Sequence, residues 1–172
     1  MEEFLATVCT MEWNAELDRG APFDQASAPL LERHPDKAGL ILAYHDRWDE
    51  MILREIPGTA DVLASVRRAG RRLLGLTNFW PDTFRSVRER FPSLGLFDGF
   101  VVSGEEGVTK PDPEIYRILC RRFEFDSQEA LFVDDVPANL GPAEALGFHT
   151  IRFTDAVALQ RRLEELGVLP RS

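Results

Sequence analysis

The sequence is poor in cysteine, the residue that small secreted domains and many metal-bound domains use to hold their folds. Only two cysteines, Cys9 and Cys120, occur in the 172 residues, and they are far apart. This excludes a disulfide framework and a cysteine-rich zinc site. A reducing compartment, the cytoplasm, is therefore the expected location.

Long apolar runs and an excess of positive charge are also absent. No stretch of about 18 apolar residues occurs, so we expect no membrane partner. The first four residues, MEEF, are acidic where a signal peptide would be basic. The net charge of −9 would repel phosphate backbones, so nucleic acid is not an expected partner.

What the sequence does contain is enough apolar surface for one core domain, since 44% of its residues are hydrophobic. Residues 1–54 show apolar residues at helical spacing and no confident strand. One helix is expected near Phe4, a second from Phe23 to before Pro35, and a third from about Asp36 to Leu53. The apolar face of the third helix includes Leu40, Ile41, Tyr44, Trp48 and Met51.

The pattern changes after residue 58, where strands begin to alternate with helices. Short apolar runs typical of buried strands occupy residues 73–77, 97–103, 130–133 and 148–153. Helices are expected over residues 59–70, 81–91, 111–123, 137–146 and 155–166, with Thr59 as the N-cap of the first. This alternation predicts an α/β fold with a parallel sheet flanked by helices. We therefore divide the chain into a helical segment, 1–54, and an α/β core, 55–172.

Polar residues follow three of the expected strands and are expected to meet at one edge of the sheet, where ligands bind in such folds. They are Thr77, Asn78, Lys110, Asp134 and Asp135. Each has a plain alternative, as a turn or helix-capping residue or as an exposed lysine. Together they suit a magnesium ion and a phosphoryl group, because carboxylates bind hard cations while lysine, hydroxyl and amide groups bind phosphate oxygens.

Three segments carry a family resemblance: LGLTN at 74–78, KPDPEIY at 110–116 and LFVDDVPAN at 131–139. Their order and spacing resemble the second, third and fourth motifs of the haloacid-dehalogenase-like (HAD) hydrolases, over about residues 55–155. The resemblance implies a Rossmann-like core and Mg²⁺-dependent hydrolysis of a small phosphorylated metabolite. It also implies that residues 1–54 are the small helical cap that closes over the site and selects the substrate.

The resemblance also implies a role for each site residue. Thr77 would bind the phosphoryl oxygens, with Asn78 in support. Lys110 would steady the phosphate and the nucleophile. Asp135 would be the direct magnesium ligand, with Asp134 as its partner in the site.

The first family motif is missing from the sequence. It is an apolar strand ending in Asp-x-Asp, which supplies the attacking aspartate and a general acid and base. In the family this strand is central, between the strands that here end at Thr77 and Asp134. We therefore expect Met1 to be an internal methionine of a longer protein and the chain alone to be inactive. A strand-swapped oligomer is an open alternative.

Other functions stay open beside this interpretation. A metal-independent 2-haloacid dehalogenase shares the family, but as the resemblance goes such enzymes lack the paired carboxylates. A non-catalytic binding or regulatory module could have kept Lys110 and Asp135 and lost the nucleophile. Arg19, Phe79 and Trp80 are weaker candidates for the substrate pocket, with exposure or core packing as their plain alternatives.

Overall fold

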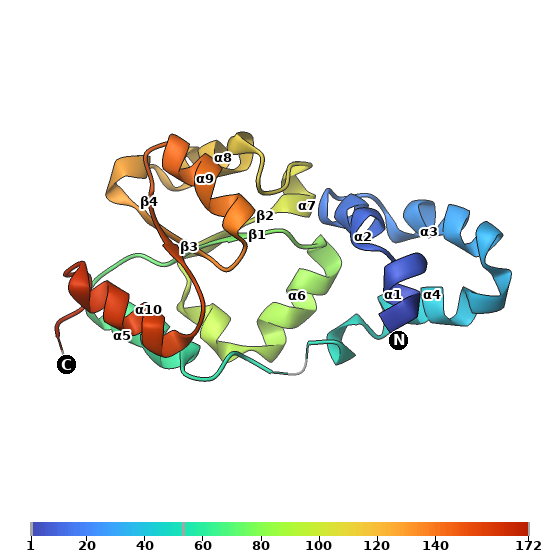
Figure 1. The fold of residues 1–172 in the computed structure, drawn as a ribbon, viewed down its shortest axis with the longest axis horizontal. Helices are drawn as coiled ribbons and strands as arrows, with labels where there is room; N and C mark the ends of the chain where they lie inside the picture. The colour runs from blue at the N-terminus through green and yellow to red at the C-terminus, as the bar shows by residue number, and fades with distance from the viewer. Residues whose placement is uncertain (1, 53, 172) are drawn as a thin grey trace.

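The protein combines helices with short parallel strands in a computed structural model that describes residues 2–52 and 54–171. The first four helices form one end of the molecule (Figure 1). They are α1 (Glu2–Thr7), α2 (Met11–Asp18), α3 (Phe23–Arg33) and α4 (Ala38–Asp46). Their apolar faces pack together around Trp13, Leu17 and Ile41, and Trp13 donates a 2.8 Å hydrogen bond to the carbonyl of Ala26. We call α1 to α4 the helical end.

The rest of the chain alternates strands and helices, as the sequence predicts. The strands are β1 (Leu74–Thr77), β2 (Gly99–Val102), β3 (Leu131–Asp134) and β4 (His149–Arg152). The helices are α5 (Thr59–Arg68), α6 (Pro81–Arg90), α7 (Ser103–Glu106), α8 (Pro113–Phe123), α9 (Pro137–Ala145) and α10 (Ala156–Glu165). The predicted α/β fold class is confirmed.

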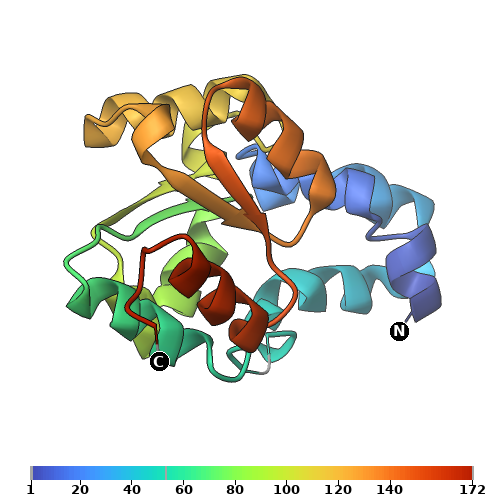
Figure 2. The same ribbon diagram turned by 60° about the vertical axis from the view of Figure 1, so that its left-hand side comes forward.

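The strands form two separate parallel pairs. Strand β1 pairs with β2, with Thr77 opposite Val102, and β3 pairs with β4, with Asp134 opposite Arg152. Among the described residues, no strand pairs with the second edge of β1 or of β3. Figure 2 shows the two pairs as distinct ribbons, β1 and β2 in green to yellow and β3 and β4 in orange.

Helices cover the two pairs on opposite sides. Helices α8 and α9 lie on one side, and α5 and α10 on the other (Figure 1). The first group encloses a core around Ile115, Tyr116 and Phe132, and the second a core around Val62 and Leu163. No helix in the described part of the chain is long and apolar enough to cross a membrane.

Two predictions of local structure are wrong. Thr59 is the first residue of α5, and the N-cap is Gly58, whose φ of 81° is a conformation that glycine adopts easily. The third helix ends at Asp46, and a 3₁₀ turn, Trp48–Glu50, follows it. This turn lets the Trp48 ring contact Phe79, with ring centroids 6.1 Å apart.

The apolar face predicted for the third helix is also smaller than expected. Ile41 is fully buried, whereas Leu40 and Met51 are 51% and 44% exposed. The predicted helix end at Leu53 lies outside the described residues. The domain boundary at residue 54 stays a prediction.

Candidate active site

The end of β1 is joined to the segment that carries Lys110. Thr77 is the last residue of β1, and Asn78 follows it. The Asn78 side-chain amide donates to the carbonyl of Lys110 at 2.9 Å, and its oxygen accepts from the Lys110 backbone N–H at 2.8 Å. This pair of hydrogen bonds fixes the Lys110 backbone beside the end of β1.

The Lys110 side chain then reaches the end of β3. Its ammonium donates to Asp134 Oδ2 at 2.6 Å, and only 12% of the lysine side chain and 4% of the aspartate side chain are exposed. The other carboxylate oxygen, Oδ1, accepts from the Val136 backbone N–H at 2.8 Å and from the Asn139 amide at 2.9 Å. A buried carboxylate is stable only with such partners.

Two of the predicted site residues keep their polar groups free. The Thr77 hydroxyl and the Asp135 carboxylate make no hydrogen bond or ion pair with other residues in the described parts of the chain, and Asp135 is exposed. Each lies next in sequence to a residue of the bonded group formed by Asn78, Lys110 and Asp134. The backbones of the predicted site residues therefore meet at these strand ends, while the role of each residue stays a prediction.

The donor set suits a magnesium ion that keeps most of its water. Within residues 2–52 and 54–171, no group of three or more His, Cys, Asp or Glu residues could enclose a metal. Asp134 uses both oxygens for protein contacts, so Asp135 is the better candidate for a direct ligand. Magnesium commonly takes one or two carboxylates, waters and a substrate phosphate, which this open arrangement allows.

Sequence reasoning assigned no role to two residues that support this site. Asn139 is 6% exposed, and its amide holds Asp134 in place. The Tyr116 hydroxyl donates to the carbonyl of Asn139 at 2.7 Å. Burial, and then the charge of Asp134, raise the pKa of Tyr116 well above its usual range, so it stays a neutral donor. Both residues lie in the segments that carry the family resemblance, and this position could have indicated that they support the site.

Aromatic residues connect the site to the helical end. Trp80 is 7% exposed and belongs to the core of the helical end, with its ring centroid 5.8 Å from Phe23 and 4.8 Å from His45. Core packing therefore explains Trp80, and Phe79 remains the candidate for a pocket wall. Arg19 is exposed at the end of α2.

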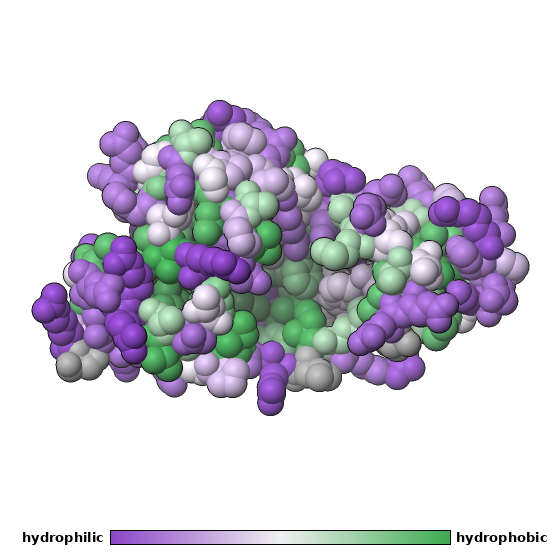
Figure 3. Space-filling model, viewed as in Figure 1, coloured by the Kyte–Doolittle hydropathy of each residue, from purple (hydrophilic) through white to green (hydrophobic). Residues whose placement is uncertain are grey.

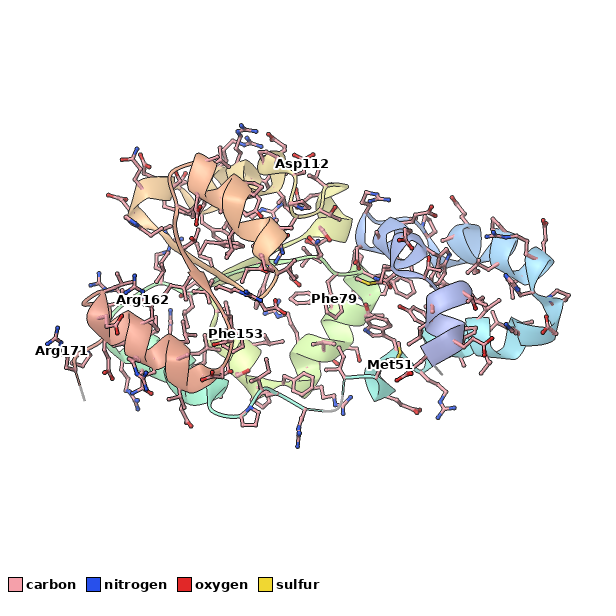
Figure 4. All side chains as sticks on the ribbon, viewed as in Figure 1. Met51, Phe79, Asp112, Phe153, Arg162 and Arg171 are labelled. Atoms are coloured by element: carbon pink, nitrogen blue, oxygen red, sulfur yellow. The ribbon has the colours of Figure 1, made fainter. Side chains whose placement is uncertain are left out.

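One face of the molecule is hollowed near its centre. The face in Figure 3 has a central depression lined by apolar residues and bordered by hydrophilic ones. Phe79 and Phe153 both lie beside this depression in Figure 4. Phe153 packs against the core between α5 and α10.

Known proteins with similar sequences include both phosphatases and a dehalogenase. The chain is 31% identical over 114 residues to the sesquiterpene phosphatase astK of Aspergillus oryzae, covering 66% of this chain and 58% of that protein. It is 33% identical to the glyceraldehyde 3-phosphate phosphatase of Pyrococcus abyssi, covering 66% and 48%. It is 29% identical to (S)-2-haloacid dehalogenase 1 of a Pseudomonas strain, covering 76% and 55%. The chain thus spans about half the length of these curated relatives.

Solved structures show the same fold. A predicted HAD-like family hydrolase from Porphyromonas gingivalis matches with a TM-score of 0.72 and 26% identity, over 94% of this chain and 87% of that one. A HAD family enzyme of Bacteroides thetaiotaomicron, solved with magnesium and inorganic phosphate, matches with a TM-score of 0.51 and 26% identity, over 55% and 50%. The family model for haloacid dehalogenase-like hydrolases matches residues 8–147. The chain therefore belongs to the haloacid dehalogenase-like hydrolases.

Proposed function

We propose that the chain forms the phosphate- and magnesium-binding part of a phosphatase that acts on a small phosphorylated metabolite. The observation that carries this proposal is the hydrogen-bonded group Asn78–Lys110–Asp134, which places an ammonium, an amide and a carboxylate between two strand ends. Phosphoryl transfer depends mainly on such positioning and on the neutralisation of charge. The phosphatases among the similar proteins support the same class of reaction.

In this proposal two residues bind the phosphoryl group directly, and two support it. Lys110 directs its ammonium at the phosphate oxygens, and the free Thr77 hydroxyl donates a hydrogen bond to another of them. Asn78 keeps Lys110 in place through its backbone. Asp135 would hold Mg²⁺, which supplies positive charge for the phosphate oxygens.

The nucleophile is the part that the described residues do not supply. Of the four described strands, β3 alone ends in a carboxylate, and Asp134 is already bonded to Lys110. We propose that an extended segment ending in Asp-x-Asp lies between β1 and β3 and pairs with both. Unpaired strand edges accept such a strand readily, and the parallel order would bring its acidic end beside Thr77 and Lys110.

A complementation assay tests this proposal. Purified chain of verified mass is assayed for hydrolysis of p-nitrophenyl phosphate with Mg²⁺, alone and with an apolar strand peptide ending in Asp-x-Asp. The matched control peptide ends in Asn-x-Asn. We expect turnover only with the aspartate peptide and Mg²⁺. Turnover by the chain alone, at the level seen with the aspartate peptide, would contradict the proposed position of the nucleophile.

One observation favours a second candidate, a metal-independent 2-haloacid dehalogenase, because the Pseudomonas relative carries that activity in its name. The exposed Asp135 beside Asp134 argues for the phosphatase, since a second carboxylate is needed to bind Mg²⁺ but not for a reaction without a metal. Chloride release from 2-chloropropionate that withstands a chelator would favour the dehalogenase. Binding of Mg²⁺ and phosphate without turnover under any condition would favour a non-catalytic module. The cytoplasmic location and a strand-swapped oligomer stay predictions.

A further inference from the structure

Ser103 lies where three distant segments of the chain meet. It is the first residue of α7, directly after β2, and it is fully buried. Its hydroxyl donates a hydrogen bond to the carbonyl of Asp18, at the end of α2, at 2.5 Å. The same oxygen accepts from the backbone N–H of Phe79 at 2.9 Å. One hydroxyl thus bonds both the helical end and the loop that follows β1.

The backbones around this hydroxyl approach each other too closely for side chains. A methyl group on Gly20 would lie 2.4 Å from the carbonyl oxygen of Gly104, and one on Gly104 would lie 2.5 Å from Pro81 Cδ. Gly20 also has a φ of 91°, which favours glycine. Helices α2 and α7 are in contact here (Figure 1). The helical end therefore makes a close backbone contact with the core here, in addition to the ring contacts of Trp80.

The loop held by Ser103 is also the loop that positions Lys110. Phe79 follows Asn78 directly, and the Asn78 side chain binds both backbone groups of Lys110. Lys110 in turn binds Asp134. A continuous path of hydrogen bonds and adjacent residues therefore runs from α2 to the end of β3.

We propose that Ser103 is a positioning residue that couples docking of the helical end to the geometry of the phosphate site. The Phe79 N–H can only donate, so the hydroxyl proton points to the Asp18 carbonyl when α2 is docked. When α2 moves away, that proton loses its acceptor in a buried position, and the hydroxyl turns to find another. The hold on Phe79 then weakens, and with it the Asn78 contact to Lys110. The identity of the ligand, a phosphate, rests on the proposed function, whereas the coupling through Ser103 does not.

A double-mutant cycle on the protein without ligand tests the coupling. The readout is hydrogen exchange of the Lys110 backbone amide, which donates to Asn78. Gly20→Ala disturbs the docking contact, and Ser103→Ala removes the hydroxyl with little change in volume. We expect each variant to speed exchange by about tenfold, the effect of one lost buried hydrogen bond. We expect the double variant to be no faster than either single variant.

Controls separate coupling from general loosening. Gly39→Ala changes a glycine of the helical end that has no neighbour within 4 Å, and Ser65→Ala removes an exposed hydroxyl bonded within α5. Neither should alter Lys110 exchange. Ser103→Thr, which keeps the hydroxyl, should restore the response to Gly20→Ala. If Ser103→Ala does not fold, Ser103→Cys replaces it, because sulfur is a weak donor and acceptor.

Two results would overturn the coupling: additive effects of Gly20→Ala and Ser103→Ala on Lys110 exchange, or no effect of Gly20→Ala. Binding of inorganic phosphate with Mg²⁺ is measured on the same variants. If the unmodified chain binds no phosphate while the exchange cycle shows coupling, the proposed function fails and the role of Ser103 stands. If phosphate binds and the exchange effects are additive, the proposed role of Ser103 is rejected and the proposed function is kept.

Discussion

The Lys110 ammonium donates a 2.6 Å hydrogen bond to the Asp134 carboxylate, and this ion pair links two strand pairs that share no backbone hydrogen bonds between strands in the described structure. The lysine is held from the β1 side by Asn78, and the aspartate ends β3. The ion pair therefore has a structural task, since it adds a polar link to the apolar packing that Val101 and Phe132 share, and a proposed chemical task at the phosphate site.

Removing one member of this pair should destabilise the fold strongly. Lys110→Met leaves Asp134 buried without its cation, and we expect the free energy of unfolding to fall by about 3 kcal/mol. Asp134→Asn in the Lys110→Met background should recover part of that loss, because the buried charge is gone. Urea unfolding measures both. The control Arg162→Met breaks an exposed pair with Glu165 and should change stability by less than about 1 kcal/mol. Equal losses in Lys110→Met and Arg162→Met would refute this assignment.

Gly75 should not tolerate a side chain. It lies in β1, and a methyl group there would come within 2.2 Å of the Phe100 ring. We expect Gly75→Ala to lower the free energy of unfolding by about 1–3 kcal/mol through overpacking, and Phe100→Leu to relieve part of this loss. Thermal unfolding of the two single variants and the double variant provides the comparison. A Gly75→Ala protein as stable as the parent would show that the β1–β2 packing is looser than described. Gly95→Ala is the matched control, since nothing lies near that position.

Asp18 should make stability depend on pH. Burial raises the pKa of Asp18 from its ordinary value of 3.8 to about 6, against the opposing effects of Arg19 and Asn14. Between about pH 4 and 6 the folded state then binds more protons than the unfolded state, so stability falls as pH rises through that window and is constant above it. The side chain is only partly buried, so we expect a loss of about 1–2 kcal/mol rather than the full value of the shift.

The measurement for Asp18 is urea unfolding at several pH values between 4 and 7.5, compared with Asp18→Asn. The parent should lose stability relative to the variant as pH rises, and the difference should level off above about pH 7. A difference that is flat across this window would mean that the Asp18 carboxyl is better solvated than its burial indicates.

The sequence was informative about strands and about the residues that follow them. Each strand coincides with one of the predicted apolar runs to within two residues at its ends, because a buried parallel strand requires such a run. Thr77, Lys110 and Asp134 could be found because parallel strands bring their carboxyl ends to one edge. The exposed Leu40 shows where hydrophobic periodicity fails, since it indicates an apolar face but not whether a neighbour covers it.

Contacts between distant segments could not be predicted. Ser103 donates a hydrogen bond to the carbonyl of Asp18, 85 positions away, and no sequence pattern around either residue predicts that contact. Helix α7 was missed because its four residues are too few to show a period. Helix α2 was not predicted as a separate helix, because its start depends on Thr10, whose hydroxyl accepts from the Trp13 N–H at 3.3 Å.

The most direct test of the central claim is an NMR titration of the ¹⁵N-labelled chain with inorganic phosphate and Mg²⁺. The account predicts that the backbone amides of Thr77, Asn78, Lys110 and Asp135 shift together, with one affinity. The Mg²⁺-dependent part of the response should vanish in Asp135→Asn and persist in the control Asp36→Asn, an exposed acid of the helical end. Shifts that fall elsewhere, or a response identical in Asp135→Asn and the parent, would contradict a shared magnesium and phosphate site at these strand ends.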